Sequence, residues 1–115
     1  MYDIYDDNVF ITVFDLLKDY HVLRLKFHKT EKYTLGEKIE ENMLDLLMNI
    51  VEAGHAKKQY KIPFIEHALT KIECIKILVR LAAVLHLLSE KQYLSFQERI
   101  HRTGQMLGGW RNKTD

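Results

Sequence analysis

The chain has 115 residues, with 17 basic and 16 acidic side chains, a formal net charge of +1 and 47% hydrophobic residues. That length is enough for one domain with a single core, and the composition is that of a globular protein rather than a disordered or fibrous one. One proline and five glycines disfavour a turn-rich β protein, and a net charge near zero gives no overall attraction to nucleic acid or membrane.

The first residues indicate the compartment. The stretch 1–10 is acidic and lacks a basic region followed by an apolar one, so no secretory signal is expected. Cys74 is the single cysteine and cannot form an internal disulfide. We expect it to be a small buried residue in a reducing compartment, and the cytoplasm is the expected location.

Hydrophobic spacing predicts two helices in the first half of the chain. The first covers residues 8–27, where apolar side chains recur every three or four positions. A charged connector follows. Thr34 and Glu37 then form the pattern of a capping box, in which each side chain satisfies a free backbone N–H. A second helix over 34–56 is therefore expected.

The third predicted helix, 63–88, begins with Pro63 in its first turn and carries more apolar surface than one bundle helix needs. Its second apolar stripe consists of Leu78, Leu81, Leu85 and Leu88. A helix that is apolar nearly all round is buried on most sides. We expect this helix to be central and to contact a partner beyond its own chain.

A membrane span is the rival interpretation of the same stretch. The apolar run 75–88 has 14 residues and still contains Lys76, Arg80 and His86, whereas a span needs roughly 20 mostly apolar residues. A buried helix with no membrane contact is therefore preferred, with His86 as a core or interface residue.

The fourth predicted helix covers residues 89–108. Ser89 and Gln92 repeat the capping-box pattern at its start, and Gly108 with Gly109 is expected to end it. Short connectors between long helices imply antiparallel neighbours. The sequence thus predicts an all-α fold, a single up-down-up-down four-helix bundle over residues 1–115.

Two E-x-x-H pairs, Glu52 with His55 and Glu98 with His101, match the motif that di-iron bundles use. Ligands of such a centre must project into the core. Helical phase places both pairs away from the apolar stripes, so no metal site is predicted. No glycine-rich phosphate loop, H-E-x-x-H motif or nucleophile elbow is present in the sequence, so no enzyme and no cofactor are predicted.

Charge is unevenly distributed. Residues 1–20 hold five acidic side chains against one lysine, whereas 24–32 and 57–80 are mainly basic. One interpretation is a set of solvated helix faces. The alternative is a basic zone for nucleic-acid phosphates, which needs only local positive charge. Tyr33, Tyr60 and Trp110 lie near these bases and are placed either to stack on RNA bases or to pack within the protein.

Three stretches of the chain form a recognisable set: YTLGEKIEENMLDLL at 33–47, HLLSEKQYLSFQERI at 86–100 and GQMLGGW at 104–110. Together they resemble the four-helix-bundle family that contains the accessory variability determinant of diversity-generating retroelements. That family also includes bundle proteins encoded in intervening sequences of bacterial ribosomal RNA genes. The resemblance covers nearly the whole chain, from the first helix to Trp110.

The resemblance implies a homopentameric barrel that binds the retroelement reverse transcriptase and RNA or DNA, and supports mutagenic copying of template RNA. It implies no catalysis by this chain. Accessory determinants of this kind are strongly basic, whereas this chain is nearly neutral. The ribosomal-RNA branch, of structural or unknown role, is therefore the alternative.

A ring of identical protomers repeats each local basic zone, so several phosphates can still meet a cation. The bases expected to contact nucleic acid are Lys57, Lys58, Lys61, Lys76, Arg80, Arg99, Arg102, Arg111 and Lys113. Arg80 is the one basic residue in an otherwise apolar half-helix, and either binds a phosphate or pairs with Glu73 or Asp45. The expected subunit contact consists of Leu78, Leu81, Leu85 and Leu88.

Overall fold

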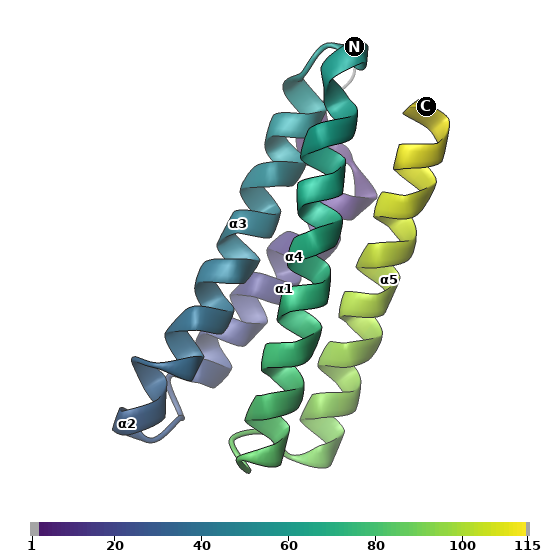
Figure 1. Ribbon diagram of the computed structural model, residues 1–115. Coiled ribbons are helices and arrows are strands. Elements are labelled where there is room, and N and C mark those ends of the chain that lie inside the picture. Colours follow the sequence, from purple (N-terminus) through teal and green to yellow (C-terminus); the bar gives the residue numbers. More distant parts are fainter. Residues whose placement is uncertain (1–2, 115) are drawn as a thin grey trace.

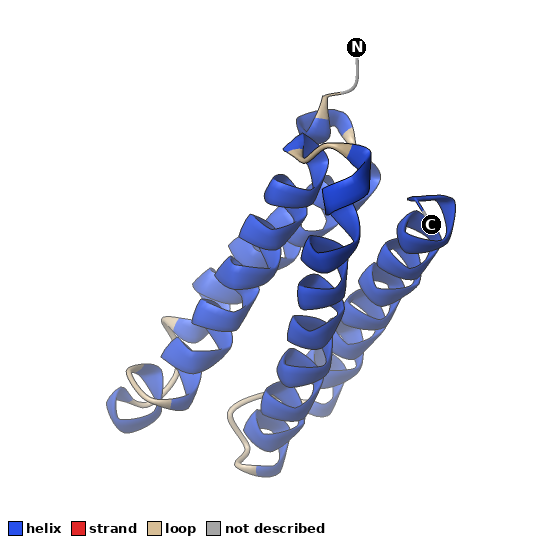
Figure 2. Cartoon of the chain, turned by 45° about the horizontal axis from the view of Figure 1, so that its top comes forward, coloured by secondary structure: helices blue, strands red, loops and turns tan. Residues whose placement is uncertain are grey.

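The computed structural model describes residues 3–114, and within this range all regular structure is helical (Figure 2). The four long helices are α1 (Asn8–Arg24), α3 (Leu35–His55), α4 (Lys58–Val84) and α5 (Glu90–Thr114). A 3₁₀ turn, η1 (Ile4–Asp6), precedes α1, and a one-turn helix, α2 (Lys29–Lys32), lies between α1 and α3.

Successive long helices run antiparallel and form a rod with extents of 44 × 21 × 19 Å. Each of α1 and α4 packs against both α3 and α5, so α1 lies diagonally across the bundle from α4. Figure 1 shows the start of α1 and the end of α5 at the same end of the rod, with α2 at the opposite end. The predicted all-α, up-down-up-down four-helix bundle is confirmed.

The core follows from the apolar stripes. Leu16, Met43, Ile75 and Ile100, one from each long helix, are fully buried. Tyr20 is also buried and packs edge-on against the rings of Phe27 and Phe96, with centroids 6.2 and 6.1 Å away.

Helix starts agree only partly with the predicted caps. At α5 the capping box forms as predicted: Gln92 N donates to Ser89 Oγ (3.1 Å), and Ser89 N donates to Gln92 Oε1 (2.8 Å). At α3 it does not, because the Thr34 hydroxyl donates instead to the Thr30 carbonyl (2.8 Å). This bond ties the Thr34 side chain to α2, one turn back, and the hydroxyl oxygen accepts no bond from the backbone N–H groups that begin α3.

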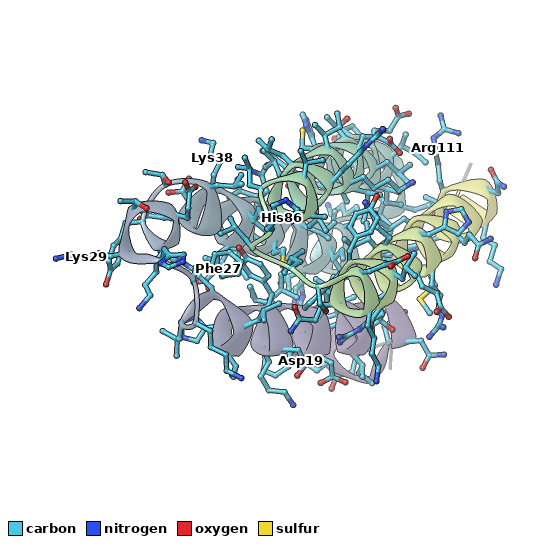
Figure 3. The ribbon with its side chains drawn as sticks, turned by 90° about the horizontal axis from the view of Figure 1, so that it is seen from below. Asp19, Phe27, Lys29, Lys38, His86 and Arg111 are labelled. Atoms are coloured by element: carbon cyan, nitrogen blue, oxygen red, sulfur yellow. The ribbon has the colours of Figure 1, made fainter. Side chains whose placement is uncertain are left out.

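The first helix ends at Arg24 rather than at residue 27. The backbone N–H groups of Lys26 and Phe27 donate to the carbonyls of Leu23 and Arg24, which tightens the chain into a turn. This turn buries the Phe27 side chain, which points into the bundle in Figure 3, viewed along the rod. The predicted charged connector contains the short helix α2.

The third long helix begins five residues earlier than predicted, at Lys58, so that Pro63 lies inside it. Pro63 lacks only the N–H that would donate to the carbonyl of Gln59, close to the helix start. One missing bond near an end is tolerated, so the helix passes through Pro63 instead of beginning there as predicted.

The same helix ends at Val84 rather than at Leu88. Leu87 N donates to the Ala82 carbonyl and His86 N to the Ala83 carbonyl, the bond pair of a Schellman motif. His86 occupies the left-handed position of this motif, with φ of 62°, and is exposed. The alternative of a core histidine is therefore wrong, whereas that of an interface histidine stays a prediction.

The last helix continues through Gly108 and Gly109 to Thr114 instead of ending at residue 108. Glycine weakens a helix by about 1 kcal/mol per residue but does not forbid it. Leu107 is fully buried and Trp110 packs against the core, so tertiary contacts hold the last turns in place.

Candidate functional site

An apolar surface covers the second half of α4, which we call the α4 face: Ile77, Leu81, Val84 and Leu85. Ile77 and Val84 are 68% and 65% exposed, and Leu81 and Leu85 are 44% and 47% exposed. Four large apolar side chains grouped on one helix surface are typical of an interaction site rather than of scattered surface residues.

The four predicted contact leucines divide between this face and the core. Leu81 and Leu85 lie on the α4 face, and Leu78 is half-buried against the core. Leu88 is only 6% exposed, because the turn after Val84 folds it into the protomer. Leu88 therefore offers almost no surface to another subunit.

Sequence reasoning missed the two most exposed members of the face. Ile77 and Val84 lie three or four positions from Leu81 and therefore on the same side of the helix. The sequence did show that this helix is apolar around most of its circumference. Which of its apolar residues face inward and which face outward depends on how α3 and α5 pack against it.

Beside the α4 face, a groove of about 300 Å³ runs between α3 and α4, with an almost wholly apolar surface. Its lining is Lys38, Asn42, Cys74, Ile77 and Leu78. Cys74 is half-buried here rather than buried as expected, since it lies on the outer side of α4 next to Ile77.

A second surface, which we call the basic end, forms where the start of α4 meets the end of α5. Its members are Lys57, Lys58, Lys61, Arg111 and Lys113. The Lys61 ammonium group lies 5.9 Å from the centre of the Trp110 ring, which ties the two helices together. Lys57, Lys58 and Lys113 are exposed and form no ion pair with any residue between 3 and 114.

Two members of the basic end have structural partners. Lys61 Nζ donates to the carbonyls of Ala53 and Gly54, at 2.7 and 3.2 Å, and so caps the last turn of α3. Arg111 forms an ion pair with Glu66 at 2.8 Å. Positive charge available to a ligand thus comes mainly from Lys57, Lys58 and Lys113.

A cavity of about 470 Å³ lies at the same end, between the start of α1 and the end of α5. Its lining is Asp7, Asn8, Val9, Met106, Gly109, Trp110 and Lys113. Trp110 packs against the core and also lines this cavity, so the packing interpretation holds and stacking on RNA stays a prediction. Continuation of α5 beyond Gly109, which the sequence did not predict, builds the cavity.

The other four predicted nucleic-acid contacts lie away from the basic end. Arg99 pairs with Asp19 at 3.0 Å, Arg102 with Glu98 at 2.9 Å and Lys76 with Glu73 at 3.4 Å. Asp19 lies on the outside of α1 in Figure 3. These ion pairs neutralise part of the charge that a phosphate would need.

Arg80 is exposed on the α4 face and pairs with no residue between 3 and 114. Its expected partners are engaged elsewhere, since Asp45 pairs with Lys71 at 3.4 Å and Glu73 with Lys76. Arg80 lies about 33 Å along α4 from Lys58 by the helical rise. It cannot share one small binding surface with the basic end.

The E-x-x-H residues Glu52, His55, Glu98 and His101 are all exposed, in agreement with their helical phase. Among residues 3–114, no three His, Cys, Asp or Glu side chains come together as metal ligands would. In the same part of the chain, none of the helices combines the length and the hydropathy that crossing a membrane requires.

A family model described as bAvd-like matches residues 12–114. No curated protein and no solved structure matches the chain. The matched range contains α2, α3, α4 and α5 in full and most of α1.

Proposed function

The chain belongs to the bAvd-like family, and on this basis we propose that it is a non-catalytic accessory protein of a diversity-generating retroelement. In this role it binds the reverse transcriptase of the element and nucleic acid, and supports mutagenic copying of template RNA. The family match over residues 12–114 carries the proposal.

The proposed nucleic-acid contact is the basic end. Its three unpaired lysines, Lys57, Lys58 and Lys113, come from two helices that meet at one end of the rod, next to Trp110. Lysine side chains on neighbouring helix ends suit a phosphate backbone, because each can reach a different phosphate without fixed geometry. Trp110 also lines the adjacent cavity, so the exposed part of its ring offers an aromatic surface on which an unpaired base can stack.

The proposed assembly is a closed homo-oligomer, with five protomers as the family resemblance implies. The α4 face supports this proposal, because burying Ile77, Leu81 and Val84 against another subunit removes exposed apolar area from water. A ring also repeats Lys57, Lys58 and Lys113 around its axis, which compensates for the small charge of one chain.

The reverse-transcriptase proposal is tested by mixing the purified chain with the reverse transcriptase encoded nearest to its gene. The expected result, in size-exclusion chromatography with light scattering, is one peak containing both proteins in a fixed ratio. A reverse transcriptase from an unrelated retroelement serves as the control. Separate elution at tens of micromolar would contradict this part of the proposal.

The alternative function is that of a bundle protein encoded in a ribosomal RNA intervening sequence. The net charge of +1 favours this alternative, because a nearly neutral chain has little overall electrostatic attraction to nucleic acid. It predicts an assembled protein that neither co-elutes with a reverse transcriptase nor binds RNA at low salt.

A further inference from the structure

The outer side of α4 and the outer side of α3 carry opposite charges on apolar surfaces. On α4, Arg80 lies among Ile77, Leu81 and Val84, and it has no ion-pair partner between residues 3 and 114. Removing an arginine from water without pairing it to an anion costs free energy. A partner that covers this apolar face is therefore expected to supply an acidic group for Arg80.

The outer side of α3 supplies such groups. Leu44 and Met48 are exposed on it, and Glu37, Glu41 and Glu52 flank them at helical spacing. Glu41 has a partner in Lys38, at 3.7 Å, whereas Glu37 and Glu52 form no ion pair with a described residue. The α3 surface is therefore acidic where the α4 face is basic.

The antiparallel register between α3 and α4 within one protomer sets the height of each of these groups, that is, its position along the long axis of the bundle. Lys71 lies opposite Asp45, and Cys74 and Leu78 share a groove with Asn42 and Lys38. Continuing this antiparallel register places Arg80 level with Glu37, to within about one residue rise of 1.5 Å.

A ring axis parallel to the rod preserves height, because rotation about that axis moves no atom along it. In such a ring, Arg80 of one chain lies level with Glu37 of the next chain. The outer sides of α3 and α4 are neighbouring corners of the bundle and face roughly 90° apart. Two contact faces at about that angle close a ring after roughly four or five copies, whereas opposite faces build a filament.

We propose that the contact between identical chains is heterologous: the α4 face of one protomer covers the outer side of α3 of the next, with Arg80 paired to Glu37. This inference rests on the proposed assembly and adds its two surfaces and their ion pair. The exposed side chains of Leu44 and Met48 on α3 supply the apolar part of this contact.

A charge-swap experiment tests the pair. Arg80→Glu and Glu37→Arg each place like charges opposite one another, and each is expected to shift the mass in light scattering from the assembly to a single chain. The double variant Arg80→Glu with Glu37→Arg restores opposite charges and is expected to recover the assembly. Circular dichroism checks that helix content is unchanged in all three.

The matched control is Arg102→Glu, which reverses an exposed arginine on α5, away from both surfaces, and is expected to leave the mass unchanged. Single variants that keep the wild-type mass, or a double variant that stays dissociated, would overturn the Arg80–Glu37 contact while leaving the assembly itself in place. Loss of RNA binding in Arg80→Glu with the mass unchanged would assign Arg80 to nucleic acid instead. A monomeric wild-type chain would overturn both this contact and the proposed assembly.

Discussion

The Tyr20 hydroxyl donates a hydrogen bond to the backbone carbonyl of Gly36, with 2.9 Å between the two oxygens, and so joins α1 to the first turn of α3. Glycine suits this tightly packed position, because a Cβ at Gly36 would lie 3.0 Å from the Glu31 carbonyl oxygen and 3.1 Å from Phe27 Cδ2, so these neighbours would have to shift. Burial raises the pKa of Tyr20 well above its ordinary value, and the nearby Arg24 only partly offsets that effect.

This raised pKa predicts a loss of stability in alkali. The folded chain keeps the Tyr20 proton above pH 10, whereas the unfolded chain releases it near the ordinary tyrosine pKa of about 10. The unfolded state then binds fewer protons, so the free energy of unfolding falls as pH rises above about 10. Tyr20→Phe is expected to flatten this fall in urea titrations, at a cost of about 1 kcal/mol at pH 7 for the lost bond. An unchanged alkaline slope would contradict the assignment.

Gly54 is the second glycine that packing requires. A Cβ there would lie 2.7 Å from Ile4 Cδ1 and 2.9 Å from Ile4 Cβ, so Gly54→Ala must displace the buried Ile4 side chain. We expect a loss of about 1–2 kcal/mol in the free energy of unfolding, although alanine favours a helix.

The matched control for Gly54→Ala is Gly108→Ala. A Cβ at Gly108 meets no atom within 4 Å, so the helix propensity of alanine is expected to raise stability by about 0.5–1 kcal/mol. Chemical denaturation compares the two variants, and a change of the same sign in both would contradict the proposed Ile4–Gly54 contact.

The backbone of His86 is strained at its φ of 62°, because the left-handed region costs a residue with a side chain about 1 kcal/mol. His86→Gly is therefore expected to stabilise the protomer by about 1 kcal/mol, while His86→Ala keeps the strain and gains nothing. Denaturant midpoints measure both. Equal stability of the glycine and alanine variants would show that the strain is absent.

Substitutions at Leu81 and Leu88 distinguish a loss of assembly from a loss of folding. Leu81→Glu adds a charge to an exposed helix position, so helix content and thermal stability of the protomer are expected to persist while the assembly dissociates. Leu88→Glu buries an unpaired carboxylate and is expected to destabilise the fold by several kcal/mol. Circular dichroism and light scattering distinguish the two outcomes. Dissociation of Leu88→Glu without unfolding would instead place Leu88 at the subunit contact and contradict its assignment to the core.

Much of the fold follows from sequence periodicity, because four long apolar stripes can be buried in few ways. The cap at Ser89 is equally local, since both of its bonds lie within four residues. Helix ends are harder to predict where tertiary packing opposes local preference. Leu107 and Trp110 hold α5 helical through Gly109, and the burial of Leu88 folds the chain away from the α4 axis.

The candidate surfaces are less accessible from sequence, because a charge has functional meaning only once its neighbours are known. Arg99 and Arg111 look like free bases in the chain, yet each pairs with an acid distant in sequence, Asp19 or Glu66. Arg80 shows the opposite case: both of its expected partners bind lysines, which leaves the arginine available on an apolar face.

The most direct test of the proposed function is RNA and DNA binding over a salt series, measured by fluorescence anisotropy with labelled single strands. The triple variant Lys57→Ala, Lys58→Ala, Lys113→Ala is expected to weaken binding and to lower the log–log salt slope by roughly 2, at about 0.7 per phosphate contact. The control triple Lys26→Ala, Lys29→Ala, Lys91→Ala removes three exposed lysines at the opposite end and should leave the slope unchanged. No binding at low salt, or an unchanged slope in the first triple variant, would contradict a nucleic-acid function.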